Sequence, residues 1–263
     1  MKIVIVGGVA GGASAAARAR RLNEEAEILV FERGPYVSFA NCGLPYHIGG
    51  AIKDRSALLL HTPESLKARF NIEVRVNHEV KSIDKEKHTV TVVDLKSNRS
   101  FDESYDKLIL SPGASAFVPP VPGADGTNVF TLKTIPDMDG IVEFMKVKSP
   151  KHATVIGGGY IGLEAAENLK EKGLNVAVIE MADQVMTPAD ADMAAILHEH
   201  IGLYGVQLHL GAGLEKLEHK EGGRTTVSAK GVEPFETDLV IMAVGVRPEN
   251  ELAKAADLDI GPR

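Results

Sequence analysis

Two stretches of the chain share one order of apolar, glycine-rich and helical positions. In the first, the apolar run Lys2–Val6 leads into a glycine turn, an alanine-rich stretch ending at Leu22, and a second apolar run, Ile28–Phe31. Short runs of β-branched residues without polar alternation are typical of strands buried in a parallel sheet. The pattern therefore predicts a strand–turn–helix–strand (βαβ) unit that closes on Glu32.

The same pattern recurs about 150 residues later. The strand Thr154–Ile156 is followed by a glycine turn, a helix ending near Lys172, and the apolar run Val176–Ile179, which closes on Glu180. A single glycine run is also compatible with a flexible loop. Two such runs, each between a β-branched strand and a helix, make that alternative weak and predict two βαβ units.

The chain between the two units alternates polar and apolar residues at Glu79–Ile83 and Thr89–Asp94. This alternation predicts an antiparallel hairpin. Tyr105–Leu110 predicts a further buried strand, and the stretch Val118–Gly126, rich in proline and glycine, predicts a linker.

After the second unit, the pattern predicts one helix and several strands, at Asp190–Leu203, Val206–His209, Thr225–Ala229 and Leu239–Val244. We therefore expect an α/β protein with two Rossmann-like, doubly wound domains, each carrying a small antiparallel insert. The predicted domains are residues 1–115 and 151–263, with a linker and the start of the second domain at 116–150.

Composition narrows the classes of function. The 263 residues allow one large or two modest domains, and 44% hydrophobic residues argue against wholesale disorder. A net charge of −7 disfavours binding to nucleic acid or to an anionic membrane. The sequence has no apolar run of about 18 residues, and its amino terminus does not resemble a signal peptide. The cytoplasm is therefore the expected compartment.

The chain contains one cysteine, Cys42, which excludes an internal disulfide, a Cys-x-x-Cys redox pair and a cysteine-rich zinc site. His198 and His200 are two positions apart on a predicted helix, so they point to different faces and are not a metal pair. No metal is expected. Any thiol chemistry of this chain must use a single sulfur.

The second glycine turn is a full G-x-G-x-x-G motif, formed by Gly157, Gly159 and Gly162. These glycines allow the tight turn, the approach of backbone to a pyrophosphate, and close packing of helix on strand. Glu180 follows 23 residues after Gly157, where an acid binds ribose hydroxyls. Because a carboxylate there repels a 2′-phosphate, we expect NADH to be preferred over NADPH.

The first glycine turn is irregular, since Val9 occupies the middle glycine position. Its acid, Glu32, follows 25 residues after Gly7. Two such units in one chain imply two nucleotides, and the economical pair is FAD in the first domain and a nicotinamide in the second.

Cys42 lies in the segment SFANCGLPY, shortly after the first βαβ unit. Asn41 and Gly43 flank it like the start of a short helix, and a helix amino terminus favours a thiolate. The alternative is a buried structural cysteine, which is a common fate of an unpaired one.

The sequence resembles those of the flavin-dependent pyridine nucleotide–disulfide oxidoreductases. More narrowly, it is similar to their single-cysteine branch, the coenzyme A-disulfide reductases and NADH-dependent persulfide or polysulfide reductases. The resemblance rests on VGGVAGGASAAARARRL, SFANCGLPY, YDKLILSPGAS, VIGGGYIGLEAAENL and IMAVGVRPE, which occur in the family's order. It implies a glutathione-reductase-like fold with both dinucleotide domains.

The resemblance also implies roles for individual residues. FAD would be bound by Gly7, Gly8, Ala10, Gly11, Glu32, Arg33, Asn41, Val80, Ser111, Pro112, Gly113 and Lys133. NADH would be bound by Gly157, Gly159, Tyr160, Ile161, Gly162, Glu164, Glu180 and Gly245, with Tyr160 gating the nicotinamide pocket. Coenzyme A would contact Ser14, Arg18, Arg21, Ser38 and Asn41.

The two arginines also carry an argument of their own. Arg18 and Arg21 are three positions apart on a helix and share a face, where guanidinium groups could bind phosphate oxygens in bidentate fashion. A solvated helix face is the alternative. His47, near Cys42, could assist proton transfer, although a packing or surface role is favoured.

The implied reaction passes electrons from NADH through FAD to Cys42, which cycles through a mixed disulfide with coenzyme A disulfide or a persulfide. The main competing reaction is that of an NADH oxidase or peroxidase that uses a sulfenic acid. Single-cysteine enzymes of that type usually carry a histidine in the first glycine turn, where this chain has Ala10. The sequence is also compatible with three further hypotheses: a flavin-free dehydrogenase, a non-catalytic nucleotide-binding or redox-sensing module, and an inactive fragment.

Relatives of this kind continue beyond the equivalent of Arg263. They return to the flavin domain with a strand ending in Gly-Asp and then form a homodimer through a carboxy-terminal domain. We therefore expect the chain to be truncated and its flavin domain to be incomplete.

Overall fold

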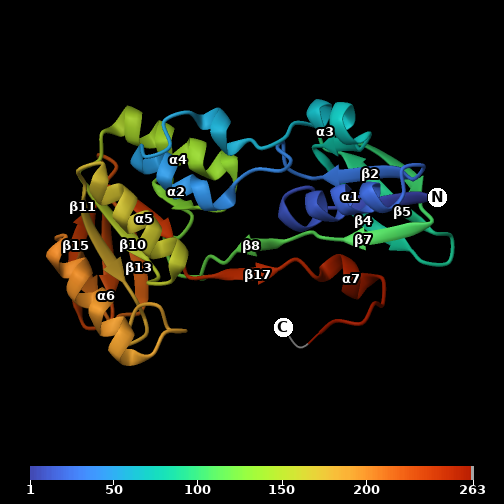
Figure 1. Cartoon of the computed structure of the whole chain (residues 1–263). Helices are drawn as coiled ribbons and strands as arrows, with labels where there is room; N and C mark the ends of the chain where they lie inside the picture. The colour runs from blue at the N-terminus through green and yellow to red at the C-terminus, as the bar shows by residue number, and fades with distance from the viewer. Residues whose placement is uncertain (262–263) are drawn as a thin grey trace. The chain divides into compact units, whose positions relative to one another are not determined.

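The first βαβ unit forms the centre of a four-stranded parallel sheet in the computed structural model, which describes residues 1–261. The strand order is β3-β2-β1-β7. Two of these strands, β2 and β7, are labelled in Figure 1. The strands are β1 (Lys2–Val6), β2 (Glu27–Glu32), β3 (Glu73–Val76) and β7 (Lys107–Leu110). Helix α1 (Ala10–Leu22) connects β1 to β2, as the apolar pattern predicts.

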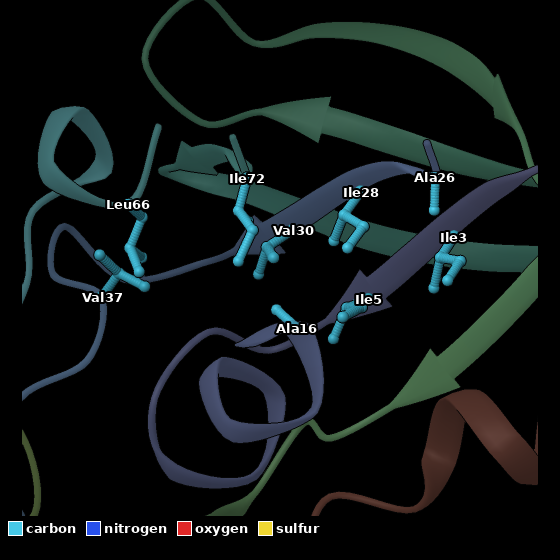
Figure 2. Close-up of a cluster of buried hydrophobic side chains, with 9 residues drawn as sticks. All are labelled: Ile3, Ile5, Ala16, Ala26, Ile28, Val30, Val37, Leu66 and Ile72. Carbon is cyan, nitrogen blue, oxygen red and sulfur yellow. The ribbon is translucent and has the colours of Figure 1, made fainter. Parts of the chain in front are cut away.

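One face of this sheet forms a hydrophobic core with α1. Figure 2 shows Ile5 of β1 and Val30 of β2 on the same side of the sheet as Ala16 of α1. Leu66 and Ile72 complete this core from a segment that follows β2 in sequence. Leu66 belongs to α3 (Pro63–Phe70), whose start is capped by reciprocal hydrogen bonds between Thr62 and Ser65.

The other face of the sheet packs on an antiparallel sheet and a short helix. The antiparallel strands are β4 (His78–Asp84), β5 (Thr89–Asp94) and β6 (Arg99–Ser104), in that order. Phe31 of β2 and Val92 of β5 meet in the second core, against which Leu252 of α7 (Glu251–Ala255) packs.

The second βαβ unit forms a five-stranded parallel sheet with the order β12-β11-β10-β16-β9. Its strands are β9 (Val129–Thr131), β10 (His152–Ile156), β11 (Asn175–Ile179), β12 (Gln207–His209) and β16 (Leu239–Met242). The helices of this part are α4 (Ile135–Lys148), α5 (Tyr160–Glu171) and α6 (Ala191–Leu203). An antiparallel ribbon of β13 (Leu214–His219), β14 (Thr225–Ala229) and β15 (Val232–Thr237) packs on the sheet through Val227 and Ile156.

The cysteine segment forms a 3-10 turn, η1 (Asn41–Gly43), followed by α2 (Leu44–Gly49). Pro45 and Ile48 of α2 are buried, and together with Ala165 and Leu169 of α5 they line a small internal void. A second 3-10 turn, η2 (Arg55–Leu58), follows. The segment is therefore anchored to α5 by apolar packing.

The chain divides into two compact units: residues 1–40, 56–115 and 248–263 form unit 1, and residues 41–55 and 116–247 form unit 2. This division differs from the predicted boundaries at two segments. Residues 41–55 cluster with unit 2 because α2 packs on α5, and the last segment clusters with unit 1 because Leu252 packs on its core. Two of the points at which the chain passes from one unit to the other lie in β8 (Ala114–Ala116) and β17 (Val246–Pro248). These two strands pair with each other.

The predicted fold class is confirmed, since both units combine a parallel sheet with an antiparallel one. The predicted linker Val118–Gly126 contains no helix or strand. The region 116–150, predicted as a linker and the start of the second domain, also supplies β9 and α4 to unit 2. None of the described helices is long and apolar enough to span a bilayer.

Candidate functional site

The glycine turn of unit 2 joins β10 to α5 and is as tight as its motif predicts. Gly157 has a φ of +108°, and a Cβ on it would lie 2.4 Å from the carbonyl oxygen of Ala243. A Cβ on Gly162 would lie 1.9 Å from the carbonyl oxygen of Gly157. Around Gly159, by contrast, a Cβ would meet nothing within 4 Å. Two glycines therefore close the turn, while the middle one leaves open space.

That open space belongs to a cavity of about 620 Å³ at the carboxyl ends of β10, β11 and β16. Its walls include Gly157, Gly159, Tyr160, Ile161, Glu180 and Gly245, all predicted for NADH. Tyr160 is 65% exposed at the start of α5. A cavity at this edge of a parallel sheet, beside a helix amino terminus, is where dinucleotides bind.

Glu180 follows β11 directly, and its carboxylate is held by backbone groups. One oxygen accepts a hydrogen bond from the amide of Gly158 at 2.5 Å, and the other accepts one from the amide of Ala182 at 2.8 Å. The carboxylate is thereby fixed at the wall of the cavity. The end of the second strand is the position at which an acid of this kind of unit hydrogen-bonds a ribose.

Two residues predicted for NADH do not line this cavity. Gly162 lies behind it, where it permits close packing of α5 on the turn. Glu164 is one turn along α5 and interacts with Tyr46 of α2 instead. Methionine and threonine side chains after β11 line the cavity but carry no motif that would predict them; they are Met181, Met186 and Thr187.

The glycine turn of unit 1 repeats this geometry although its motif is irregular. Gly7 has a φ of +92°, and its Cβ would lie 2.0 Å from the carbonyl oxygen of Ser111. A Cβ on Gly12 would lie 1.8 Å from the carbonyl oxygen of Gly7. Val9 occupies the N-cap position of α1 and makes no capping hydrogen bond with its side chain. The glycines that close the turn are therefore present, and only the middle position departs from the pattern.

Glu32 occupies the same place in unit 1 as Glu180 does in unit 2. Its carboxylate accepts hydrogen bonds of 2.7 Å from the amides of Gly8 and Gly34. It lines a cavity of about 370 Å³ together with Gly7, Arg33, Val80 and Pro112, all predicted for FAD. Of the other predicted residues, Gly11 faces the side chain of Ser111 across the turn.

The wall of this cavity also contains residues that the sequence alone does not predict. Glu249, Glu251 and Leu252 belong to the segment that returns to unit 1. Arg33 forms an ion pair of 2.9 Å with Glu249. No local motif marks these residues, because they reach the cavity through contacts with distant parts of the chain.

Cys42 is exposed in η1, immediately before α2. The alternative of a buried structural cysteine is therefore wrong. Tyr46 lies one helical turn further on, and α2 packs on α5 in unit 2. The pKa of Tyr46 is raised by the negative charge of Glu164, then by burial and by the charges of Glu167 and Cys42. Burial and the charge of Glu167 raise the pKa of Glu164.

Four ionisable groups thus lie near one another in unit 2: Cys42, Tyr46, Glu164 and Glu167. Negative charge on Glu164, Glu167 and Cys42 opposes ionisation of Tyr46, and negative charge on Glu167 opposes ionisation of Glu164. The segment SFANCGLPY includes Tyr46 but gives no signal that the carboxylates of Glu164 and Glu167 on α5 lie near it.

Two further predicted residues, Asn41 and Lys133, contact each other. The side-chain amide of Asn41 donates a hydrogen bond of 3.2 Å to the carbonyl oxygen of Lys133. Both belong to unit 2. His47 is held by a 2.8 Å hydrogen bond between its Nδ1 and the carbonyl oxygen of Ile52, which supports its packing role.

The predicted coenzyme A residues of α1 form one exposed face. Ser14, Arg18 and Arg21 are all exposed and are spaced by four and three positions. Arg20, between them in sequence, is buried and donates hydrogen bonds to backbone carbonyls, including that of Phe70. Ser38 lies beside the glycine turn, since its amide donates to the carbonyl oxygen of Gly8.

Comparison with known proteins identifies the family. The profile described as "Pyridine nucleotide-disulphide oxidoreductase" matches residues 1–263. This chain belongs to that family. A coenzyme A disulfide reductase from Staphylococcus aureus strain JH9 is 40% identical over 259 residues, which are 98% of this chain and 57% of that protein.

Solved structures agree with this assignment. The chain is 51% identical to reduced Bacillus anthracis CoADR-RHD, with a TM-score of 0.96 and coverage of 100% of this chain and 47% of that one. An NAD-dependent persulfide reductase from A. fulgidus is 34% identical, with a TM-score of 0.95 and coverage of 100% and 48%. A water-forming NADH oxidase from Lactobacillus brevis is 35% identical, with a TM-score of 0.92 and coverage of 100% and 57%.

The chain therefore spans about half the length of the relatives it matches. The resemblance to pyridine nucleotide–disulfide oxidoreductases is confirmed. The individual residue roles remain predictions, which the cavities and contacts described above make specific.

Proposed function

We propose that this chain carries electrons from NADH through FAD to Cys42, which reduces coenzyme A disulfide or a coenzyme A persulfide or polysulfide. The observation that carries the proposal is an exposed sole cysteine in a chain with two acid-flanked glycine-turn cavities. The names of the relatives from Staphylococcus aureus and A. fulgidus support this choice of substrate. Two nucleotides and one thiol are the parts that the reaction needs.

The residues present in unit 1 fit a flavin dinucleotide. The turn at Gly7 and Gly12 leaves no room for side chains, and Glu32 is fixed by backbone amides at the cavity wall. Gly7, Glu32, Arg33, Val80 and Pro112 would hold FAD there. When bound, FAD supplies a path for two electrons from NADH to the sulfur of Cys42.

The chemistry of Cys42 follows from its being the only cysteine in the chain. Its thiolate attacks one sulfur of the disulfide, forms a Cys42–substrate disulfide and releases the first thiolate, which takes a proton. Two electrons from NADH and one further proton break that mixed disulfide, release the second thiol and restore the Cys42 thiolate. Tyr46 follows Cys42 by four residues, and the negative charges of Glu164, Glu167 and Cys42, together with burial, raise the pKa of its hydroxyl, which favours the protonated form near this sulfur.

A second candidate is an NADH oxidase that cycles through a Cys42 sulfenic acid. The likeness to the Lactobacillus brevis enzyme favours it, at an identity similar to that of the persulfide reductase. Ala10 in the first glycine turn counts against it. The two candidates differ in product, because one releases thiols and the other consumes dioxygen.

The test uses the purified chain, reconstituted with FAD. We expect flavin absorbance in the protein fraction and NADH-dependent release of thiols from coenzyme A disulfide under nitrogen. Thiol release from a coenzyme A persulfide is measured in parallel to separate the two substrates. NADH consumption that requires dioxygen and yields no thiol would favour the oxidase, and a chain that binds no flavin would overturn the proposal.

The choice of nicotinamide cofactor is a separate prediction. Because Glu180 is a fixed carboxylate at the cavity wall, we expect NADPH to bind at least about tenfold more weakly than NADH. Glu180→Gln should reduce this difference, since it removes the charge but keeps the size. Titration of both cofactors into both proteins measures the effect, and equal affinity of the wild-type chain for NADH and NADPH would contradict it.

The exposed face of α1 provides the prediction on coenzyme A. Arg18→Ala combined with Arg21→Ala should raise KM for coenzyme A disulfide, because guanidinium groups bind its phosphates. KM for a small disulfide without phosphates should not change. Lys67→Ala, which removes one cation from α3 of the same unit, is the control. Equal losses on both substrates would show that the arginines have another role.

For the whole protein we propose a homodimer formed through a carboxy-terminal domain and a place in the cytoplasm, as the family resemblance implies. Its partners would be small disulfides or persulfides, with neither nucleic acid nor membrane among them. A measured mass in solution of the longer protein tests the dimer.

A further inference from the structure

The loop between β11 and α6, residues 180–190, forms one wall of the cavity in unit 2. Met181, Met186 and Thr187 line the cavity from this loop. Met186 has a φ of +51°, a left-handed conformation that a methionine rarely adopts. A loop in that conformation needs fixed contacts on both sides to keep its shape.

One side of the loop is tied to the glycine turn. The amide of Met186 donates a hydrogen bond of 2.9 Å to the carbonyl oxygen of Gly158. Val185 is fully buried, and a Cβ on Gly158 would lie 2.8 Å from its Cγ1. Val185 therefore packs directly against the backbone of the turn that faces the cavity.

The other side of the loop is tied to α6 by one side chain. The amide of Val185 donates a hydrogen bond of 3.1 Å to Nε2 of His198. Because a backbone N–H can only donate, Nε2 must carry a lone pair, and the ring proton of the neutral imidazole is on Nδ1. His198 is thus the side-chain acceptor for the amide of a buried residue at the centre of the loop.

We propose that His198 is a positioning residue for the dinucleotide. It holds Val185 against Gly158 and so keeps both the loop and the glycine turn in the shape that the nucleotide requires. The sequence pattern alone identifies His198 only as a residue that is not a metal ligand. This inference rests on the proposed NADH site in unit 2.

The test compares three variants of the full chain by NADH titration. His198→Leu leaves the Val185 amide without its acceptor, and we expect Kd for NADH to rise about five- to tenfold. His198→Gln offers an amide oxygen in place of Nε2 and should restore Kd to within about twofold of the wild-type value. His200→Leu is the matched control, because His200 is exposed on the same helix and, among the described ring contacts, meets only Tyr204, in a tilted arrangement.

A second measurement separates positioning from stability. Hydrogen exchange at the Val185 amide should be faster in His198→Leu and slow again in His198→Gln. The midpoint of thermal unfolding should fall in His198→Leu by no more than about the few degrees expected from one lost hydrogen bond, so every variant is folded at the temperature of the titration. Unchanged NADH affinity in His198→Leu would overturn the inference and leave the proposed function intact. A wild-type chain that does not bind NADH would overturn both.

Discussion

Replacing Cys42 with serine should abolish the reduction of coenzyme A disulfide, with a loss of at least about a thousandfold in kcat. No second cysteine exists to take over the attack. A serine hydroxyl is nearly isosteric, but it is not ionised at neutral pH and cannot form a disulfide. The flavin content and the NADH-dependent reduction of ferricyanide should stay at wild-type levels, because neither needs the thiol.

The control for this prediction is chemical. Cys42 is exposed, so alkylation of the wild-type chain with iodoacetamide should remove disulfide reduction to the same extent. Cys42→Ser should be insensitive to the same treatment. Retained turnover of disulfide in Cys42→Ser would refute the nucleophilic role. A simultaneous loss of flavin would show instead that the residue supports the fold.

Local pattern was sufficient to predict the two glycine turns. The contacts that close each turn lie within one βαβ unit and the strand beside it, as between Gly7, Gly12 and Ser111. The β-branched strands around these turns also predicted the parallel sheets. For that reason the fold class, and the residues at the carboxyl ends of β1 and β10, could be predicted from the sequence alone.

Contacts between distant segments could not be predicted in the same way. The placement of α2 depends on the fit of Pro45 and Ile48 against α5, more than a hundred residues later. Glu249 reaches the cavity of unit 1 through the packing of Leu252 on a core built far earlier in the chain. Apolar periodicity shows that such residues are buried but does not show against what.

The residues of the candidate site also fall into those that local pattern predicts and those that it does not. Glu32 and Glu180 were predicted because each closes a strand at a known distance from its turn. Tyr46 and His198 were not predicted for the site, because the carboxylates that raise the pKa of Tyr46 lie on α5 and His198 accepts its hydrogen bond from the loop before α6. In both cases the partner is brought close only by tertiary packing.

Replacing each of two glycines of the second turn with alanine should have different effects on stability and on NADH binding. In Gly162→Ala the new Cβ would lie 1.9 Å from the carbonyl oxygen of Gly157, which is backbone and cannot rotate away. The helix must shift, and we expect a loss of stability of about 2–4 kcal/mol. In Gly159→Ala the Cβ would meet nothing within 4 Å, and the φ of −80° suits any residue. The fold should therefore be unaffected.

For NADH affinity, the direct effect is expected from Gly159→Ala, and the effect of Gly162→Ala should be indirect. The space beside Gly159 faces the cavity, where a pyrophosphate must approach the backbone closely. Gly159→Ala should therefore weaken NADH binding by at least about tenfold, at an unchanged midpoint of thermal unfolding. Gly162→Ala should lower that midpoint and lose NADH only as a consequence of the shifted helix. If Gly159→Ala bound NADH as tightly as the wild-type chain does, the pyrophosphate could not lie at this turn, and the assignment of the larger cavity to NADH would be lost.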